Sequence, residues 1–441
     1  MKKHAGTKKD MWSSKMGFVL ASIGAAVGLG NIWRFPYIAS ENGGIWFLLP
    51  YFVCLVLVGI PLFLLESGQG FISRRAFFKS VEASTNIPFL KKNIRRAIGV
   101  FPVLVSTAIL GYYLALCSWT LWFAVEFVMG NNPLFSAMQA SYSPLIAFVI
   151  VFISAYLIAM RGVSRGIEPV AGKLVPALFA FLVLLFLYSL TLDGAIGHLL
   201  GLFTTGYGEI ADPRTWYYAL SQVLFSMSVG YGIMYTYGLH LRGGKKIFSA
   251  SWEVAGADTA ASVLAFLAIT TLAVGVGASA SGLALSFEAL PAFFSGEGLV
   301  GTIMGAAFFI LLFFAAYTSV LSMVEHSRVS TEFLGRAWGL LIIAVVFGLG
   351  LVSMLSYSPM GLALFGAPVL DVLDYVFGTF LAPFSALAIV LACAYLLPHK
   401  KLASTIGVPA KYHGLFIFVI RQAIPGALLL LIIFSQLSGL Y

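Results

Sequence analysis

The chain has 441 residues, of which 60% are hydrophobic and only 10% charged, and its mean hydropathy is +0.97. A water-soluble fold of this length cannot bury so much apolar surface, so the composition excludes that class and indicates an integral membrane protein. The net charge of +9 follows from the placement of Lys and Arg beside membrane spans and calls for no nucleic-acid partner.

Long apolar runs recur along the whole chain, and they are continuous rather than alternating. A transmembrane helix takes about 20 residues, and the absence of alternation argues against a β-barrel. We therefore predict an all-α integral membrane protein with eleven transmembrane helices. The spans are expected at residues 16–38, 44–70, 99–127, 144–161, 170–192, 216–241, 254–278, 299–327, 337–357, 371–398 and 414–439.

The basic residues orient these spans in the membrane. With the N-terminus inside, every Lys and Arg falls on the cytoplasmic side except Arg214, which lies outside, and Arg34, which lies within the first span. The positive-inside rule therefore predicts a multi-pass protein with a cytoplasmic N-terminus and an external C-terminus.

No polar linker divides the chain, so we expect one transmembrane domain over residues 1–441. The stretch SFEALPAFFSGEG at 286–298 is amphipathic and predicts a short helix over the outer face. Three cysteines lie inside apolar runs without CxxC spacing, which argues against a disulfide framework or a metal site. They are Cys54, Cys117 and Cys393.

Two spans carry helix breakers at mid-depth. The first, GAAVGLGNIWRFP at 24–36, is interrupted around Gly28 and Gly30, and the sixth, within SQVLFSMSVGYGIMYTYG, around Gly230 and Gly232. Breaks in spans one and six predict two inverted halves of five spans, at 12–192 and 216–398, followed by an extra helix at 414–439. Inverted repeats with broken helices are typical of secondary transporters.

A helix-packing motif is the alternative interpretation of these glycines, since Gly24-xxx-Gly28 permits close helix contact. Packing alone does not account for Asn31 and Arg34 one turn further on. A break frees backbone carbonyls, which survive in a membrane only where they face protein or a cavity. Freed carbonyls suit a hard cation such as Na⁺, and half-helix N-termini suit a carboxylate.

Later spans add oxygen atoms of the kind that a hard cation prefers. Asp258 lies in the seventh span, where a carboxylate is costly and by default functional; a protonated or near-interface Asp is the alternative. Thr318 and Ser319 in the eighth span could complete an oxygen cage, or could only bond to their own helix backbone.

Several motifs together resemble the neurotransmitter:sodium symporter family, and specifically its eleven-span bacterial amino-acid transporters. The resemblance implies the leucine-transporter fold and a bacterial inner membrane as the location. Beside the broken first helix it rests on ENGG at 41–44, GYY at 111–113, SxSxGYG in the sixth span, AAYTS in the eighth and DVLDY at 371–375.

This resemblance implies two sodium sites and a substrate pocket. The first sodium site would use Ala26, Asn31, Ser226 and Asp258 together with the substrate carboxylate, and the second Gly24, Val27, Ala315, Thr318 and Ser319. The substrate would lie among Ala26, Leu29, Gly30, Ile109, Tyr113, Phe225, Ser226, Ser228, Tyr231, Ser319 and Met323. Because no pocket side chain is charged, a neutral, hydrophobic or aromatic amino acid is favoured.

The resemblance also assigns gates on both sides of the pocket. On the outer side Arg34 would pair with Asp374, with Gln222 nearby; snorkelling of Arg34 toward the interface is the alternative. On the inner side Trp12 and Lys9 would take part, with Glu332 as the partner acid because Phe333 stands at the family's acidic position.

Gly166 and Pro176 match a family motif for unwinding of the fifth span, although a Gly/Pro pair also occurs in rigid kinks. Glu66 matches a buried family acid near the sixth-span break. Chloride-dependent members have Asn at the position of Asp258, with Ser one turn later, where Ser262 stands. The carboxylate of Asp258 itself supplies negative charge, so we expect no chloride.

The predicted function is therefore sodium-coupled amino-acid symport by alternating access. Two alternatives remain open: proton coupling with Asp258 as the carrier, and an amino-acid sensor of the same fold without flux. An enzyme is not expected, since the sequence shows no nucleophile dyad or metal-spaced histidines. The expected partners are an amino acid, Na⁺ and the lipid bilayer, and a homodimer is an open option for the assembly.

Overall fold

The computed structural model describes residues 10–86, 90–204, 206–276, 285–332, 335–397 and 401–438. Over these ranges the chain is helical apart from connecting loops and one antiparallel pair of two-residue strands. The strands are β1 (Ala363–Leu364) and β2 (Ala367–Pro368), with Ala363 opposite Pro368. The predicted all-α class is confirmed.

Helix occupies each of the eleven predicted spans. Among the described residues, eight helical segments are long and apolar enough to cross a bilayer, and a bent pair over Lys15–Ala26 and Gly30–Glu41 makes a ninth. The fourth predicted span is a shorter apolar helix, α8 (Pro144–Met160), and the sixth is divided into α11 (Pro213–Ser226) and α12 (Ile233–Leu239). The structure is therefore consistent with the predicted count.

The first five spans consist of long helices with short π or 3₁₀ turns at their ends and breaks. They are α1 (Lys15–Ala26), η1 (Gly30–Arg34) and α2 (Phe35–Glu41); η2 (Gly44–Phe47), α3 (Leu48–Cys54), η3 (Leu55–Gly59) and α4 (Ile60–Ser73); α6 (Lys92–Val128); α8; and η4 (Val163–Ile167) with α9 (Glu168–Ser189).

The later spans follow the same pattern. After α11 and α12 come η6 (Gly244–Lys246) with α13 (Ile247–Val276); α16 (Gly298–Glu332); α17 (Arg336–Ser356); α18 (Val369–Leu373), η8 (Asp374–Phe380), α19 (Leu381–Leu391) and η9 (Ala392–Leu396); and η10 (Ala410–Tyr412), α21 (His413–Phe418), η11 (Val419–Ala423) and α22 (Ile424–Ser438).

Short helices connect the spans. They are α5 (Phe77–Glu82), α7 (Phe135–Gln139), α10 (Ala195–Gly201), η5 (Tyr207–Ala211), η7 (Leu285–Ala289), α15 (Leu290–Gly296) and α20 (Leu402–Ile406). The predicted helix at 286–298 is present as η7 and α15.

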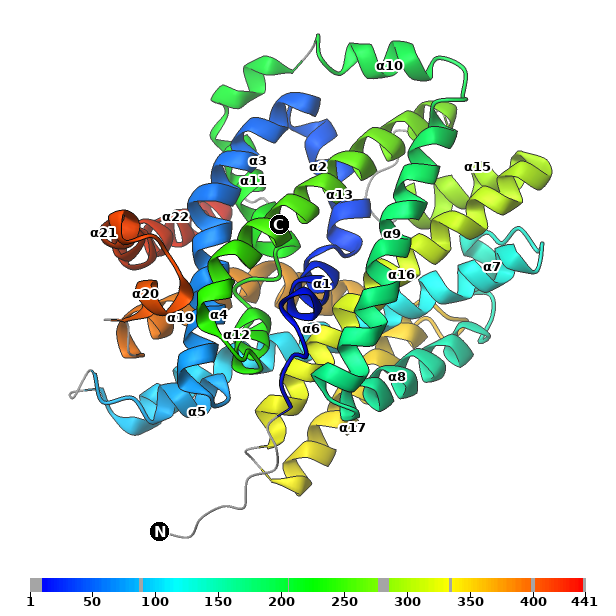
Figure 1. Ribbon diagram of the computed structural model, residues 1–441. Coiled ribbons are helices and arrows are strands. Elements are labelled where there is room, and N and C mark those ends of the chain that lie inside the picture. The colour runs from blue at the N-terminus through cyan, green and yellow to red at the C-terminus, as the bar shows by residue number, and fades with distance from the viewer. Residues whose placement is uncertain are drawn as a thin grey trace.

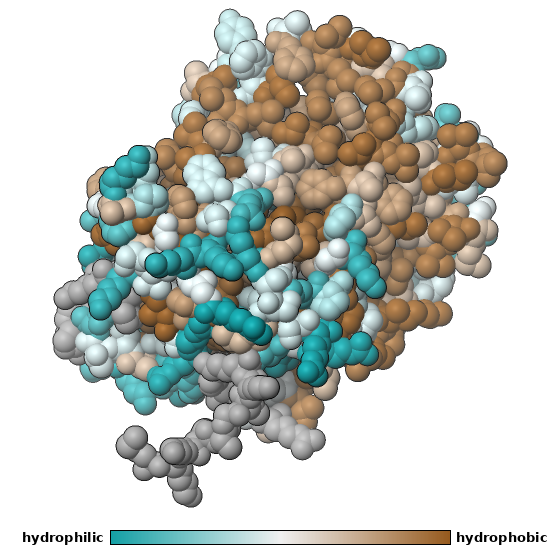
Figure 2. All heavy atoms as spheres, viewed as in Figure 1, coloured by the Kyte–Doolittle hydropathy of each residue, from teal (hydrophilic) through white to brown (hydrophobic). Residues whose placement is uncertain are grey.

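The outward faces of several spans carry large apolar side chains that no other part of the described protein covers. Ile150 on α8, Leu187 on α9, Leu340 on α17 and Leu430 on α22 are each more than half exposed. Figure 2 shows hydrophobic residues over most of one face, and hydrophilic residues gathered near the end where the N-terminal segment enters α1. Such a surface matches a bilayer rather than water.

Helix α1 lies in the middle of the bundle (Figure 1). It contacts α9, α12, α13 and α16, which belong to spans far apart in the sequence. Ala25, Ala26 and Val27 at its end are all buried. The broken first span therefore brings its freed backbone groups to the centre of the protein.

Candidate ion and substrate site

The first span is broken where the glycines predict it. Helix α1 ends at Ala26, Val27 leaves the helical conformation with ψ 95°, and the chain resumes in η1 and α2 at an angle of 50°. The side chain of Asn31 folds back, and its Oδ1 accepts the Gly28 N–H at 3.1 Å. The other backbone carbonyls at this break remain available to partners outside the first span.

The sixth span is unwound over residues 227–232, between α11 and α12. Gly230 has φ +88°, and a Cβ on it would lie 2.6 Å from the Ala386 Cβ, so both backbone and space require glycine. Glu66 accepts the Gly230 N–H at 2.5 Å. Ser228, itself in the left-handed region at φ 51°, donates its hydroxyl to the Ala25 carbonyl at 2.6 Å. One hydrogen bond thus joins the two breaks.

Asp258 is fully buried beside both breaks and is held by three donors. Its Oδ1 accepts from Asn31 Nδ2 at 2.7 Å, and its Oδ2 accepts from Ser226 Oγ at 3.0 Å and from the hydroxyl of Tyr51 at 2.7 Å. The structure therefore brings together three side chains that were assigned to the first sodium site. Tyr51 was missed, since nothing in the sequence relates it to Asp258.

Ser262 lies one turn after Asp258 and is also buried. Its hydroxyl accepts a hydrogen bond from Asn31 Nδ2 at 2.8 Å. Asn31 therefore contacts the side chains at both positions that distinguish chloride-dependent members of the family that the sequence resembles.

The residues assigned to the second sodium site surround the end of α1 where α16 passes. Ser319 Oγ lies 3.5 Å from the Gly24 carbonyl oxygen and 3.3 Å from that of Ala315. The Thr318 hydroxyl donates to the Ala315 carbonyl at 3.1 Å, and a Cβ on Gly24 would lie 3.0 Å from that of Thr318. Val27 is the C-cap residue of α1, three residues after Gly24, and it is buried. The carbonyl and hydroxyl oxygens of these residues are ligands of the kind that suits Na⁺.

A small cavity of about 40 Å³ lies between the two breaks. Ten of the eleven residues assigned to the substrate pocket line it, and the exception is Leu29, which lines a different cavity. Ala25, Gly28, Asn31, Ser106 and Ile233 complete the wall. No side chain on this wall is charged in the part of the chain that the structure describes.

Two glycines in the first span set the shape of this cavity. A Cβ on Gly28 would lie 2.8 Å from Ser319 Oγ and 3.2 Å from the Tyr113 hydroxyl, so glycine lets both hydroxyls approach the break. A Cβ on Gly30 would lie 2.5 Å from the Phe225 ring. The ring therefore rests directly on the first span.

A larger cavity of about 330 Å³, here called the vestibule, lies next to the small one. Gly30, Tyr113, Phe225 and Tyr231 line both, so these residues form the partition between them. Leu29, Arg34 and Asp374 line only the vestibule. Phe225 and Tyr113 thus stand where a ligand would pass from the vestibule to the central cavity.

Arg34 and Asp374 face the same vestibule, yet each is bonded to neutral groups. Arg34 donates to Gln222 Oε1 at 2.6 Å and to Ser221 Oγ at 3.0 Å, and its guanidinium lies 5.3 Å from the Phe225 ring centroid. Asp374 accepts from the hydroxyl of Tyr112. Among the described residues, no ion pair joins Arg34 to Asp374. The ion pair that was predicted as an outer gate is therefore not formed in this structure, and its gating role stays a prediction.

The opposite side is closed by the segment that precedes α1, here called the N-terminal closure (residues 10–14). Trp12 is 1% exposed; its Nε1 donates to the Tyr237 carbonyl at 3.0 Å and its N–H to the His240 carbonyl at 3.1 Å. The Asp10 carboxylate accepts from the Val163 N–H and from the Ser164 hydroxyl. Trp12 is thus buried on the side of the cavity opposite the vestibule, and its gating role stays a prediction.

A buried acid that sequence reasoning missed supports this closure. Glu325 on α16 is fully buried, lies 3.0 Å from His240 Nε2 and accepts two hydrogen bonds from Arg328 at 2.7 and 2.8 Å. His240 in turn contacts the Asp10 carbonyl through Nδ1 at 2.8 Å. Of the predicted Lys9–Glu332 pair, Lys9 and the Glu332 side chain lie outside the described part of the protein, as does Phe333.

The fifth span is helical through Pro176, which lies inside α9, and Gly166 lies in the π-turn η4 just before that helix. A Cβ on Gly166 would lie 2.0 Å from the Ile158 carbonyl oxygen, so close packing requires glycine there. At the start of α9, Glu168 accepts hydrogen bonds from the Ser13 N–H at 2.9 Å and from the Ser14 hydroxyl at 3.1 Å. The predicted unwinding segment thus holds the N-terminal closure.

Two broken helices that face a shared central cavity, with a vestibule on one side and a closure on the other, define a secondary transporter. A model of the sodium:neurotransmitter symporter family matches residues 9–143 and 132–440. The chain is 31% identical to an uncharacterized sodium-dependent transporter of Bacillus subtilis strain 168, and the match covers 98% of each chain. The chain belongs to the sodium:neurotransmitter symporter family.

Two further matches are to proteins whose names or titles mention an amino acid. The solved structure of MhsT in complex with L-phenylalanine matches with a TM-score of 0.83 and 30% identity, over 96% of this chain and 99% of that one. The sodium-dependent neutral amino acid transporter B(0)AT3 of Mus musculus is 32% identical over 51% of this chain and 41% of its own length. The chain is therefore a sodium-dependent membrane transporter of the leucine-transporter fold, and not an enzyme.

Proposed function

We propose that the protein is a symporter that couples the entry of Na⁺ to the import of a neutral, hydrophobic or aromatic L-amino acid. Na⁺ and the amino acid are both cargo in this proposal. Two sodium ions would bind, one beside Asp258 and Asn31 and one beside Gly24 and Ser319. The vestibule would face outside and the N-terminal closure the cytoplasm, as the placement of Lys and Arg favours.

One observation carries this proposal: the fully buried Asp258 carboxylate stands beside two unwound helices. A buried carboxylate without a cation is costly, and three neutral donors compensate only part of that cost. A monovalent cation among these oxygens would balance the charge. If the substrate carboxylate shares that cation, each ligand raises the affinity for the other by the same factor.

The central cavity supports a neutral amino acid as the substrate. Its wall is uncharged, and Ile109, Phe225 and Met323 present apolar surface. The Tyr113 hydroxyl lies beside the freed amides of the first break, where it accepts the Leu29 N–H at 3.4 Å and could donate to a substrate carboxylate. A volume of about 40 Å³ holds few water molecules, so an amino acid would displace the Phe225 and Met323 side chains.

Chloride independence follows from the same carboxylate. In this proposal the fixed charge of Asp258 takes the place of a bound anion beside the sodium sites. The Ser262 oxygen accepts a hydrogen bond from the same Asn31 amide that donates to Asp258, so Ser262 belongs to the Asp258 cluster. The proposed location of the protein is a bacterial inner membrane.

The proposal is tested with the purified full chain in proteoliposomes. Uptake of each of the twenty amino acids is measured with an inward gradient of Na⁺ or of K⁺, in chloride or in gluconate. We expect uptake of neutral apolar amino acids in Na⁺ with either anion. Uptake that is equal in K⁺ and follows a pH gradient would instead establish proton coupling, and ligand binding without uptake would establish a sensor.

Asp258→Asn gives a sharper test because it removes one charge without changing size. We expect chloride-free uptake to fall by at least about a hundredfold, the loss of roughly 3 kcal/mol that removing one partner of a buried charged pair entails. Added chloride should restore part of it. Asp193→Asn, at a residue outside the spans, is the matched control. Unchanged chloride-free uptake in Asp258→Asn would contradict the assignment.

A further inference from the structure

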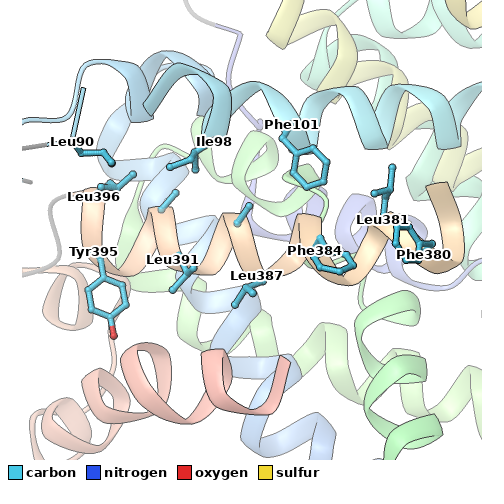
Figure 3. Close-up of a pocket in the computed structure, with 12 residues that line it drawn as sticks. Leu90, Ile98, Phe101, Phe380, Leu381, Phe384, Leu387, Leu391, Tyr395 and Leu396 are labelled. Carbon is cyan, nitrogen blue, oxygen red and sulfur yellow. The ribbon is translucent and has the colours of Figure 1, made fainter. Parts of the chain in front are cut away.

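A long apolar groove of about 860 Å³ lies away from the transport site, between α6 and the tenth-span helices η8, α19 and η9. Figure 3 shows Ile98 and Phe101 projecting from α6 toward these helices. Of the residues that line the groove, Tyr395 alone has a polar side chain, and its hydroxyl already donates to the Arg421 carbonyl. The wall therefore offers a ligand apolar contact and little hydrogen bonding.

The groove has the length of a hydrocarbon chain in a membrane. From Phe380 to Leu396 the tenth span rises about 24 Å at 1.5 Å per residue. One leaflet of the hydrocarbon core is about 15 Å deep. The groove is thus long enough for one extended acyl chain and belongs to a span whose surroundings are lipid.

Cations gather at one end of the groove and not along it. Figure 3 shows Leu90, Tyr395 and Leu396 at that end. Arg95 Nη1 donates to the Leu90 carbonyl at 2.6 Å, and the exposed Lys91 follows Leu90 in the chain. These two positive charges come from the start of α6.

A third cation reaches the same end from the last span. The Arg421 guanidinium lies 4.7 Å from the centroid of the Tyr395 ring. Its buried Nε has no hydrogen-bond partner among the described residues. By contrast, the other end of the groove is lined by Phe380, Leu381 and Phe384. A ligand that fits would be anionic at one end and apolar along its length.

We propose that this groove binds one acyl chain of an anionic phospholipid, with the phosphate against Lys91, Arg95 and Arg421. The cationic end lies on the side to which the topology assigns the cytoplasm, where the headgroups of the inner leaflet lie. The bound chain lies along η9 and α19, and α19 continues the same span from η8, which begins with Asp374 of the vestibule. The lipid therefore contacts the helix that carries one half of the predicted outer gate.

Native mass spectrometry of the purified full chain tests this proposal. The protein is delipidated in detergent and exposed to an equimolar mixture of dioleoyl phosphatidylglycerol and dioleoyl phosphatidylcholine. Each cation near an anionic headgroup contributes a few-fold in affinity, so we expect phosphatidylglycerol to be retained at least about tenfold over phosphatidylcholine. Equal retention of the two lipids, or a bound species that is no phospholipid, would overturn the proposal.

Two variants separate the parts of the proposed site. Ala388→Trp places a ring in the groove and should reduce retained phospholipid by about tenfold or more. Leu341→Trp, at a position on α17 that is 51% exposed, is the matched control and should retain the wild-type amount. Equal retention in Ala388→Trp and Leu341→Trp would show that the groove is not the binding site.

The charge variant combines Lys91→Gln, Arg95→Gln and Arg421→Gln and replaces none of the residues that line the groove. It should still retain phospholipid but bind the two headgroups equally. This variant tests the proposal even if Ala388→Trp does not fold. A preference for phosphatidylglycerol that persists without these three cations would overturn their assignment to the phosphate.

Discussion

The vestibule and the N-terminal closure lie on opposite sides of the same cavity, and they use charged groups differently. In the vestibule, Arg34 and Asp374 face an open space of about 330 Å³ and are bonded to neutral side chains. In the closure, Asp10 and Glu325 each contact groups on other segments, and the Trp12 ring is buried against Phe18 and Tyr237.

This difference identifies the side on which the transport path is closed. The charges that could close the vestibule are present but not paired, whereas the opposite side is sealed by a buried ring and a chain of hydrogen bonds. Alternating access requires these two conditions to exchange. Substitutions in the closure should therefore shift the conformational equilibrium of this state strongly, and substitutions in the vestibule should act more weakly on it.

Trp12→Ala should have the largest effect. Removing a buried Trp side chain costs about 3–5 kcal/mol, and here that loss falls on the state in which the closure is formed. We expect hydrogen exchange of the amides of residues 10–26 to accelerate strongly, with uptake greatly reduced. Trp46→Ala, at a Trp that is 38% exposed, should leave both unchanged. Unaltered hydrogen exchange in Trp12→Ala would contradict the inference that the N-terminal closure seals this side of the cavity.

Glu325→Gln should have the next largest effect. It leaves His240 and Arg328 beside a neutral amide, and loss of one partner from a buried ionic cluster costs about 3–5 kcal/mol. We expect the lower end of this range because the Arg328 side chain keeps 30% exposure and water can solvate it. Exchange of residues 10–26 should accelerate less than in Trp12→Ala. Wild-type exchange would show that the cluster does not support the closure.

Arg34→Lys should act on the vestibule alone. The guanidinium donates to Gln222 through Nη1 and to Ser221 through Nη2, whereas a lysine ammonium is a single point without this planar fork, so we expect one of the two hydrogen bonds to be lost. One lost charge-assisted bond amounts to about 1.5–3 kcal/mol. We expect slower uptake at saturating substrate while exchange of residues 10–26 stays at its wild-type rate. Arg214→Lys, at an exposed position, is the control, and faster exchange in Arg34→Lys would contradict a separation of the two sides.

Glu253→Gln should have the smallest effect on the closure. Glu253 pairs with Lys15 at the start of α1, where the two side chains are 39% and 29% exposed. Exposed ion pairs contribute about 0–1 kcal/mol, so exchange near residue 15 should change at most slightly. An effect as large as that of Glu325→Gln would mean that surface charge, and not the buried cluster, holds the closure.

The helix breaks could be predicted from sequence because glycine pairs and polar residues in apolar runs leave a local signal. Gly230 and Gly232 mark the second break, although the unwound stretch begins earlier, at Met227, because Ser228 also takes a left-handed conformation. Of the eleven residues that the family motifs assign to the substrate pocket, ten line one cavity in the structure. Leu29 differs because it lines the vestibule, whereas its neighbours Gly28 and Gly30 line the central cavity.

Contacts between distant helices could not be predicted in the same way. Tyr51 and Asp258 lie 207 residues apart, and the hydroxyl meets the carboxylate only when the bundle is assembled. The same holds for His240 and Glu325, whose sequence surroundings show no spacing that relates them. Whether Arg34 pairs with Asp374 also cannot be predicted from the sequence, because the paired and unpaired states have the same residues and differ only in conformation.

The hydrogen bonds of Glu168 have a consequence for the order of events during a transport cycle. Glu168 directly follows the π-turn that contains Gly166, and its carboxylate accepts hydrogen bonds from Ser13 and Ser14 of the closure. Asp10 accepts a hydrogen bond from the N–H of Val163, the first residue of the same turn. Unwinding at Gly166 would remove the anchor of the N-terminal segment, and release of that segment would free the turn to unwind. In the predicted cycle the two motions would therefore form one cooperative step, and a substitution that loosens either of them would lower the cost of both.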